Sequence, residues 1–152
     1  MKIGFIGAGN MAQAIIGGIL RNGIASKEEI IASAATNKTI TKVATEFGIH
    51  TTLDNRETAL ADMLFLAVKP VYYKQVIDEI KDVKAKESQI IITIAAGKSI
   101  EWVENAFGGS RKIIRTMPNT PALVGEGITA VCPNSNITET ELGNVMELLK
   151  SF

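Results

Sequence analysis

The sequence contains a single cysteine, Cys132, among its 152 residues. One cysteine excludes a disulfide bond within the chain and is typical of a reducing compartment, so we expect a cytoplasmic protein. We also expect Cys132 to be a buried strand residue. A single cysteine and a single histidine, His50, cannot form a zinc site, and we predict no metal. His50 stands beside threonines, which favours a surface position over a catalytic one.

Long apolar runs and an excess of charge of one sign are also missing. No run of about 18 apolar residues occurs, so we predict no membrane span. The 16 basic residues are balanced by 16 acidic ones, and no dense Lys/Arg cluster indicates nucleic acid or an anionic membrane surface. Neither a Ser-His-Asp set nor a pair of catalytic carboxylates can be recognised. We therefore expect a small-molecule partner, with the chemistry supplied mainly by a bound cofactor.

Apolar segments of strand length alternate with amphipathic segments of helix length along the whole chain. This alternation predicts an α/β fold, a doubly wound and mostly parallel sheet with helices on both faces. A chain of 152 residues suits one domain and is too short for a dinucleotide domain plus an equal substrate domain. The expected strands are 2–6, 30–33, 49–52, 63–68, 90–94, 112–115 and 128–132, and the expected helices are 11–20, 39–47, 56–61, 71–80, 99–107 and 138–149.

The most informative motif lies at the start of the chain, in MKIGFIGAGNMAQAIIGG. A short apolar strand runs directly into G-x-G-x-x-A, formed by Gly7, Gly9 and Ala12, and then into a helix. In a dinucleotide-binding Rossmann unit, the first glycine permits a tight turn and the second leaves room for a pyrophosphate, while a small third residue lets helix and strand pack closely. The helix start then directs N–H groups at the anion. We predict a phosphate-binding turn, with a turn that serves packing alone as the alternative.

The second expected strand ends without the acidic residue that binds the adenosine ribose hydroxyls in NAD-binding units. The residues at this place are SAATNK, numbers 33–38. Ser33, Thr36 or Asn37 can donate hydrogen bonds to a ribose 2′-phosphate, and Lys38 can add positive charge. The sequence therefore predicts NADP(H) as the preferred cofactor and NAD(H) as the second choice. The alternative for Lys38 is an ordinary solvated residue in the first turn of the next helix.

Three later strands end in segments suited to ligand binding: KP at 69–70, AAG at 95–97 and TMPNTP at 116–121. In an open α/β sheet, ligands bind in the crevice outside the carboxyl ends of the strands. Small residues let a ligand approach the backbone, and prolines hold a loop in shape before binding. Plain turns use the same residue types.

Taken together, these segments resemble the N-terminal domain of the pyrroline-5-carboxylate reductase family. The matching stretches are FIGAGNMA (5–12), FLAVKP (65–70), AAG (95–97) and RTMPNTP (115–121), the last followed by GEG at 125–127. RTMPNTP is the most specific, since many dehydrogenases share the glycine turn. The resemblance covers essentially the whole chain. It implies that residues 1–152 form the NAD(P)-binding Rossmann domain of an enzyme that reduces 1-pyrroline-5-carboxylate to L-proline, the last step of proline biosynthesis.

The resemblance also implies roles for individual residues. The glycine turn would hold the pyrophosphate, residues near the second strand the adenosine ribose and its phosphate, and the later loops the rest of the cofactor and the substrate. The implied cofactor-binding residues are Ile6, Gly7, Ala8, Gly9, Asn10, Met11, Ser33, Asn55, Ala67, Val68, Lys69, Pro70, Ala95, Ala96 and Gly97, and the implied substrate-proximal residues are Met117, Pro118, Asn119 and Thr120.

In this family a helical C-terminal domain normally follows, which forms the dimer, closes over the imine and carries a catalytic hydroxyl residue. This chain stops at Phe152, and its last helix, about 138–150, would lead toward that domain. We therefore expect a homo-oligomer for the full-length protein, no identifiable catalytic residue within the chain, and weak NADP(H) binding with little or no reductase activity for the chain alone. The alternatives are a non-catalytic nucleotide-sensing Rossmann protein and the first domain of a hydroxyacid or prephenate dehydrogenase.

Overall fold

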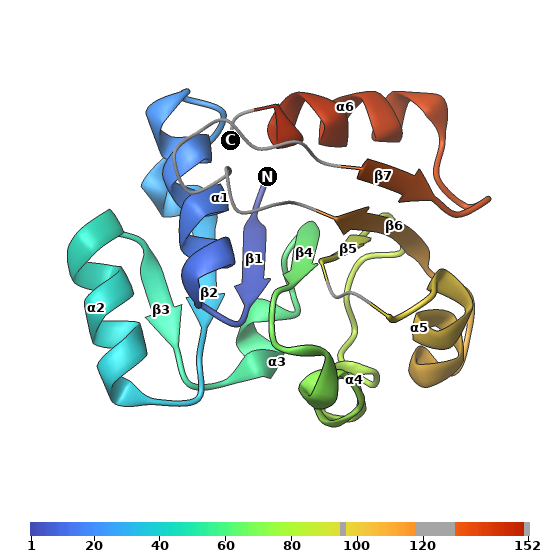
Figure 1. Cartoon of the computed structure of the whole chain (residues 1–152), viewed down its shortest axis with the longest axis horizontal. Coiled ribbons are helices and arrows are strands. Elements are labelled where there is room, and N and C mark those ends of the chain that lie inside the picture. The colour runs from blue at the N-terminus through green and yellow to red at the C-terminus, as the bar shows by residue number, and fades with distance from the viewer. Residues whose placement is uncertain (95–96, 118–129, 151–152) are drawn as a thin grey trace.

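The structure is a computed structural model that describes residues 1–94, 97–117 and 130–150 (Figure 1). Helices and strands alternate from β1 to β6, and within the described ranges β7 follows β6 directly; two short 3₁₀ helices are also present. In chain order the elements are β1 (Ile3–Ile6), α1 (Asn10–Arg21), η1 (Lys27–Glu29), β2 (Ile30–Ser33), α2 (Asn37–Phe47), β3 (His50–Thr52), α3 (Asn55–Thr58), β4 (Met63–Leu66), η2 (Pro70–Tyr72), α4 (Tyr73–Ile80), β5 (Ile90–Thr93), α5 (Ile100–Phe107), β6 (Lys112–Met117), β7 (Ala130–Pro133) and α6 (Glu139–Leu149).

Within the described ranges the strands form one seven-stranded sheet in the order β3-β2-β1-β4-β5-β6-β7. Every neighbouring pair is parallel except β6 and β7, which are antiparallel. From β1 the chain builds outward to β2 and β3, and then returns to the other side of β1 with β4. The sheet therefore has its topological switch point between β1 and β4, where open α/β sheets form a ligand crevice outside the carboxyl ends of the strands.

Helices cover both faces of the sheet, and each face has its own hydrophobic core. One core joins the sheet to α1, α2 and α6, and the other joins it to α4 and α5 (Figure 1). All residues of β1, β4 and β5 are buried, as expected for parallel strands that are covered on both faces. The rings of Phe5 and Phe65 stack across β1 and β4 with centroids 4.6 Å apart. The predicted doubly wound, mostly parallel fold is confirmed.

Several element boundaries differ from the expected ones. The helix expected at 71–80 is divided into η2 and α4, since Pro70 starts a tighter turn at its first position. Strand β6 continues two residues beyond 115 to Met117. Residues 128–129 of the expected last strand lie outside the described residues.

The expectation that Cys132 is buried is wrong, because its side chain is exposed. Strand β7 is an edge strand that pairs with β6, and its exposure alternates along the strand. Val131 packs against the core, whereas Ala130 and Cys132 are exposed. Only one face of β7 is buried, so its exposure alternates from residue to residue. The central strands are buried on both faces and show no such alternation.

A close contact places α3 directly against β1. A Cβ atom added at Gly4 would lie 2.8 Å from the Thr58 carbonyl oxygen and 2.9 Å from the Ala61 Cβ atom. Only glycine fits at this position of the strand without displacing α3. The first residue of α3 is Asn55, so this packing also brings Asn55 toward the carboxyl ends of β1 and β2.

No helix in the described part of the chain is long and apolar enough to cross a membrane.

Candidate nucleotide-binding site

The glycine turn after β1 is wedged between the ends of two neighbouring strands. Gly7 has a φ of +99°, and its N–H donates a hydrogen bond of 2.9 Å to the Ser33 carbonyl oxygen at the end of β2. On the other side, a Cβ atom at Gly7 would lie 2.7 Å from the Ala67 carbonyl carbon. Both the positive φ and the close approach of the chain after β4 require glycine here.

The start of α1 is open to an incoming anion. Gly9 occupies the N-cap position in an extended conformation, no side chain caps the helix, and its first turn contains no acidic residue. A Cβ atom added at Gly9 would meet no atom within 4 Å. Gln13 donates through Nε2 to the Ala8 carbonyl oxygen at 2.8 Å and so holds the turn in place. Uncapped helix N–H groups beside open space are a site for a phosphate group.

A hollow of about 530 Å³ opens beside this turn, on the carboxyl-edge side of the sheet. It brings together five of the predicted cofactor-binding residues: Gly7, Ala8, Gly9, Asn55 and Val68. Residues from the end of β2, from α2 and from α4 complete its wall, so the hollow spans the switch point of the sheet. Its lining consists of Gly7, Ala8, Gly9, Ala34, Ala35, Thr39, Leu53, Asn55, Val68, Tyr72, Gln75, Val76 and Glu79.

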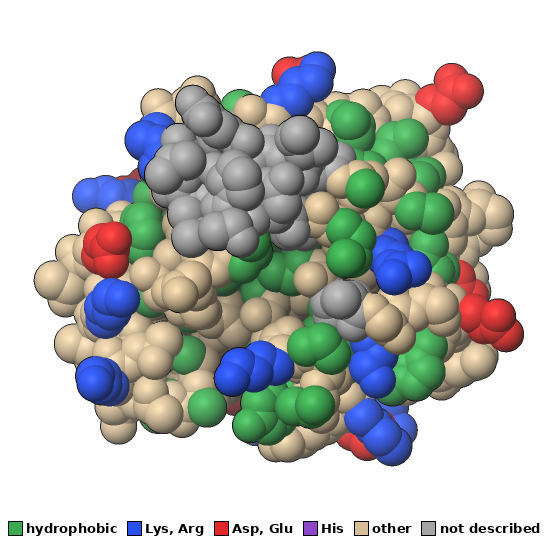
Figure 2. All heavy atoms as spheres, in the orientation of Figure 1, with side chains coloured by type: hydrophobic (Ala, Val, Ile, Leu, Met, Phe, Trp, Pro, Cys, Tyr) green, Lys and Arg blue, Asp and Glu red, His purple; other side chains and the backbone are tan. Residues whose placement is uncertain are grey.

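Part of this wall is apolar and exposed. Figure 2 shows hydrophobic side chains at the surface in the lower part of the view, in the region where Figure 1 places α4. Tyr72 is 52% exposed, and Leu53, which also lines the hollow, is 51% exposed. Exposed apolar side chains in a concave surface next to a few polar groups are typical of a small-molecule site.

A short hydrogen-bond chain crosses the hollow at the adenosine end expected for a Rossmann unit. The Ser33 hydroxyl donates to Asn55 Oδ1 at 2.8 Å, and Asn55 Nδ2 donates to Glu79 Oε2 at 2.8 Å. The sequence predicts that Ser33 binds the cofactor directly, but in the structure Ser33 is fully buried, does not line the hollow and holds Asn55 instead. Asn55 in turn follows Asp54, which caps α3 by accepting from the Arg56 N–H. The hydrogen bond to the Arg56 side chain lowers the pKa of Asp54 from its ordinary range.

Thr36 and Lys38, two further polar residues after β2, do not line the hollow. The Thr36 hydroxyl accepts from the Thr39 N–H and caps α2, which follows directly. Lys38 is an exposed residue in the first turn of α2 and does not line the hollow. Of the residues proposed to discriminate NADP(H), the structure thus shows Thr36 in a helix cap and Lys38 at the surface.

Tyr73, which the sequence did not single out, ties the loops after β4 and β5 together. Its hydroxyl donates to the Leu66 carbonyl oxygen at 2.5 Å and accepts from the Ile94 N–H at 3.3 Å. The side chain is fully buried. Tyr73 shares helical spacing with Val76, Ile77 and Ile80, a pattern that predicts burial but gives no hint of the hydroxyl's two partners.

The remaining predicted residues follow the same strand ends. Lys69 is the N-cap and Pro70 the first residue of η2, in the segment that follows β4, and the Ala67 N–H donates to the Ile6 carbonyl oxygen at 2.7 Å. Gly97 has a φ of +80°, and a Cβ atom there would meet nothing within 4 Å. Met117, the last residue of β6, is 40% exposed. Ile6 is buried in β1, and Asn10 and Met11 begin α1, whereas Ala95, Ala96, Pro118, Asn119 and Thr120 lie outside the described residues.

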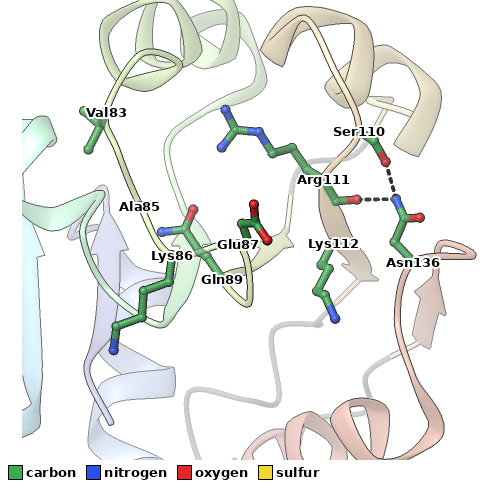
Figure 3. A pocket seen from close by; sticks show the side chains of 9 residues that line it. All are labelled: Val83, Ala85, Lys86, Glu87, Gln89, Ser110, Arg111, Lys112 and Asn136. Atoms are coloured by element: carbon green, nitrogen blue, oxygen red, sulfur yellow. Dashed lines mark hydrogen bonds between the residues drawn. The ribbon is translucent and has the colours of Figure 1, made fainter.

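A second hollow of about 520 Å³ lies at the opposite edge of the sheet, where β5 and β6 begin (Figure 3). Its amide, ammonium and guanidinium groups are bonded to other side chains and to nearby backbone, whereas Glu87 has no hydrogen-bond partner among the described residues. Asn136 donates to the Ser110 hydroxyl and the Arg111 carbonyl oxygen, and Gln89 donates to two carbonyl oxygens at 2.7 and 2.8 Å. Lys112 contacts both oxygens of Glu141 at 2.7 Å. The side-chain nitrogen donors of this hollow already have partners, so the hollow at the carboxyl edge is the candidate site for an anionic ligand.

A comparison with protein families finds a match that covers more than half of the chain. Residues 2–97 match the family described as NADP oxidoreductase coenzyme F420-dependent, a range that contains the glycine turn and β1 to β5. The chain belongs to this family.

Individual relatives are more specific. The chain is 39% identical over 152 residues to the pyrroline-5-carboxylate reductase of Escherichia coli, covering 99% of this chain and 56% of that protein. The structure of a pyrroline-5-carboxylate reductase from Coxiella burnetii has a TM-score of 0.93 at 33% identity, over 99% of this chain and 56% of that one. The Plasmodium falciparum pyrroline carboxylate reductase, solved with NADP bound, has a TM-score of 0.86 at 33% identity, over 99% and 55%. The resemblance to the pyrroline-5-carboxylate reductase family is confirmed. The chain spans little more than half the length of these relatives.

Proposed function

We propose that this chain is the NADP(H)-binding domain of a pyrroline-5-carboxylate reductase, which reduces 1-pyrroline-5-carboxylate to L-proline by hydride transfer to the cyclic imine. The proposal assigns residues 1–152 to one nucleotide-binding domain, with α6 leading toward the rest of the enzyme. The relatives extend well beyond the length that this chain spans, and we propose that their additional part corresponds to the substrate and catalytic half. A cytoplasmic location and a homo-oligomer formed through that additional part belong to the same proposal.

One observation carries the proposal: the hollow at the switch point is bounded by an uncapped helix start and a glycine that leaves open space. Gly9 gives a diphosphate access to the N–H groups of α1, and no side chain or acid competes for them. Asn55 and the apolar Tyr72 and Leu53 lie where the adenosine half of a dinucleotide would follow.

The described residues would bind and orient the cofactor. The N–H groups of α1 would hold the pyrophosphate, and Asn55 would hold the adenosine ribose. The loops after β4 and β5, which Tyr73 fixes to each other, would direct the other half toward β6 and Met117. When bound, the reduced nicotinamide supplies the hydride. The preference for NADP(H) over NAD(H) is supported by the missing acid at the end of β2 and by the NADP in the Plasmodium falciparum relative.

Titration of the purified chain with NADPH, followed by the fluorescence of the nucleotide, tests the binding half of the proposal. We expect saturable binding and a loss of about tenfold or more in affinity for Gly9→Ala, because a methyl group would occupy the space for the pyrophosphate. Lys112→Met alters the opposite hollow and serves as the matched control, with unchanged affinity. Absence of NADPH binding by the folded wild-type chain would contradict the proposal.

The reductase activity is tested with the full-length gene product, by following NADPH oxidation in the presence of 1-pyrroline-5-carboxylate. We expect turnover by the full-length product and little or none by residues 1–152 alone, because the chain provides the donor site without the other half of the relatives. NADPH binding without any imine reduction by the full-length product would instead favour a nucleotide-sensing protein on the same fold.

A further inference from the structure

The hollow contains a carboxylate that does not come from the end of β2. Among the described residues that line it, Glu79 of α4 is the only acid, and no Lys or Arg lines it. The usual acid of an NAD-binding unit is absent from residues 33–38, so a search of that strand end alone finds no negative charge. The fold supplies one from α4, whose Glu79 contacts Asn55.

Two side-chain amides hold the Glu79 carboxylate. Asn55 Nδ2 donates to Oε2 at 2.8 Å, and Gln75 Nε2 donates to Oε1 at 3.4 Å. The same Asn55 accepts the Ser33 hydroxyl through Oδ1 at 2.8 Å. A reversed Asn55 amide would place Oδ1 against the carboxylate, where two acceptors repel each other. Glu79 therefore sets the direction in which Asn55 presents its amide.

We propose that Glu79 is a specificity-determining residue of the adenosine end, a role that rests on the proposed function. It acts in two ways: it orients Asn55, and it places a negative charge beside the adenosine ribose. The charge favours a ribose with a free 2′-hydroxyl, which can donate to a carboxylate, and works against a 2′-phosphate. Glu79 thus limits the preference for NADP(H) that the missing β2 acid creates, and keeps NAD(H) as a usable cofactor.

The two effects separate in two substitutions. Glu79→Gln keeps an oxygen that accepts from Asn55 but removes the charge. At low ionic strength we expect it to raise the affinity for NADPH and for 2′,5′-ADP by about five- to tenfold, since a charge pair near a protein surface contributes on the order of 1 kcal/mol or more. The affinity for NADH is expected to stay the same or to fall. Glu79→Ala also releases Asn55, and both nucleotides are expected to bind more weakly than they bind to Glu79→Gln.

Asp78→Asn is the matched control, because it removes one charge from the neighbouring position of the same helix. Asp78 pairs with Lys74 and Lys81 and does not line the hollow. We expect it to leave the ratio of NADPH to NADH affinity unchanged, and circular dichroism should show all variants folded.

Isothermal titration with NADPH, NADH and 2′,5′-ADP gives the deciding ratios. A rise of the NADPH-to-NADH affinity ratio in Glu79→Gln that high salt weakens supports the proposal. An unchanged ratio, or an equal change for both nucleotides, overturns the role of Glu79 while leaving the proposed function intact. Failure of the wild-type chain to bind either nucleotide contradicts the proposed function, and with it this inference.

Discussion

The two edges of the sheet carry hollows of nearly equal volume, about 530 Å³ at the carboxyl edge and about 520 Å³ at the amino edge. At the amino edge the side-chain nitrogen donors are bonded within the protein, in pairs such as Lys112 with Glu141 and Lys86 with Asp62. At the carboxyl edge, the start of α1 has no side-chain cap and Gly9 faces open space. Volume alone therefore does not distinguish a binding site from a structural cleft; the state of the donors that line it does.

The largest effect is expected at the turn that shapes the carboxyl-edge hollow. Gly7→Ala places a side chain at a φ of +99° and a Cβ atom 2.7 Å from the Ala67 carbonyl carbon. We expect a loss of about 2–4 kcal/mol in the free energy of unfolding, from backbone strain and overpacking together. Urea unfolding measures it. Gly9→Ala is the matched substitution and should change stability by less than about 1 kcal/mol. Equal losses for the two variants would contradict the difference between the two glycines.

An intermediate effect is expected at the amino edge. Lys112→Met removes the cation that contacts both oxygens of the partly buried Glu141. We expect about 1 kcal/mol of destabilisation, because the carboxylate stays without its partner. Lys150→Met breaks a pair with Glu147 that is largely exposed and should cost close to nothing. Thermal unfolding compares the two. If Lys112→Met weakened NADPH binding as strongly as Gly9→Ala does, the assignment of nucleotide binding to the carboxyl edge and not to the amino edge would be wrong.

The smallest effect concerns the pH dependence of stability at the amino edge. The Lys2 backbone N–H, and then Lys86, lower the pKa of Asp62 below its ordinary value of 3.8. A carboxyl group whose pKa is lower in the folded state stabilises the fold above its unfolded pKa. That contribution is lost as the pH falls through the folded value. Urea midpoints between pH 7 and pH 3 should therefore fall less steeply for Asp62→Asn than for the wild type. Parallel curves would show that Asp62 contributes no such linkage.

The sheet could be predicted from the sequence because its central strands are covered on both faces and thus appear as uninterrupted apolar runs, such as MLFL in β4. The glycine turn could also be predicted from the sequence, since the space that Gly7 and Gly9 provide is a property of those residues themselves. Cys132 was placed wrongly because no local pattern tells an edge strand from a central one. That Gly7, Gly9 and the other residues assigned to the cofactor bind it stays a prediction.

Other features of the candidate site depend on distant segments meeting. Glu79 belongs to the hollow only because α4 packs opposite Asn55, and its own neighbours in the sequence are those of an ordinary amphipathic helix. The Tyr73 hydroxyl has a function only where the ends of β4 and β5 lie side by side. Such residues become visible when three-dimensional neighbours are known, not from spacing along the chain.

The contact between Gly7 and Ala67 has a consequence for the order of events during synthesis. The glycine turn leaves the ribosome before β4 does, yet one of its two walls is the chain just after β4. A nascent chain therefore carries the complete motif in its sequence long before it carries the site in space. Because non-local contacts form only after the intervening loop closes, the nucleotide cannot assist the first steps of folding. It can stabilise only chains in which β4 has already docked against β1.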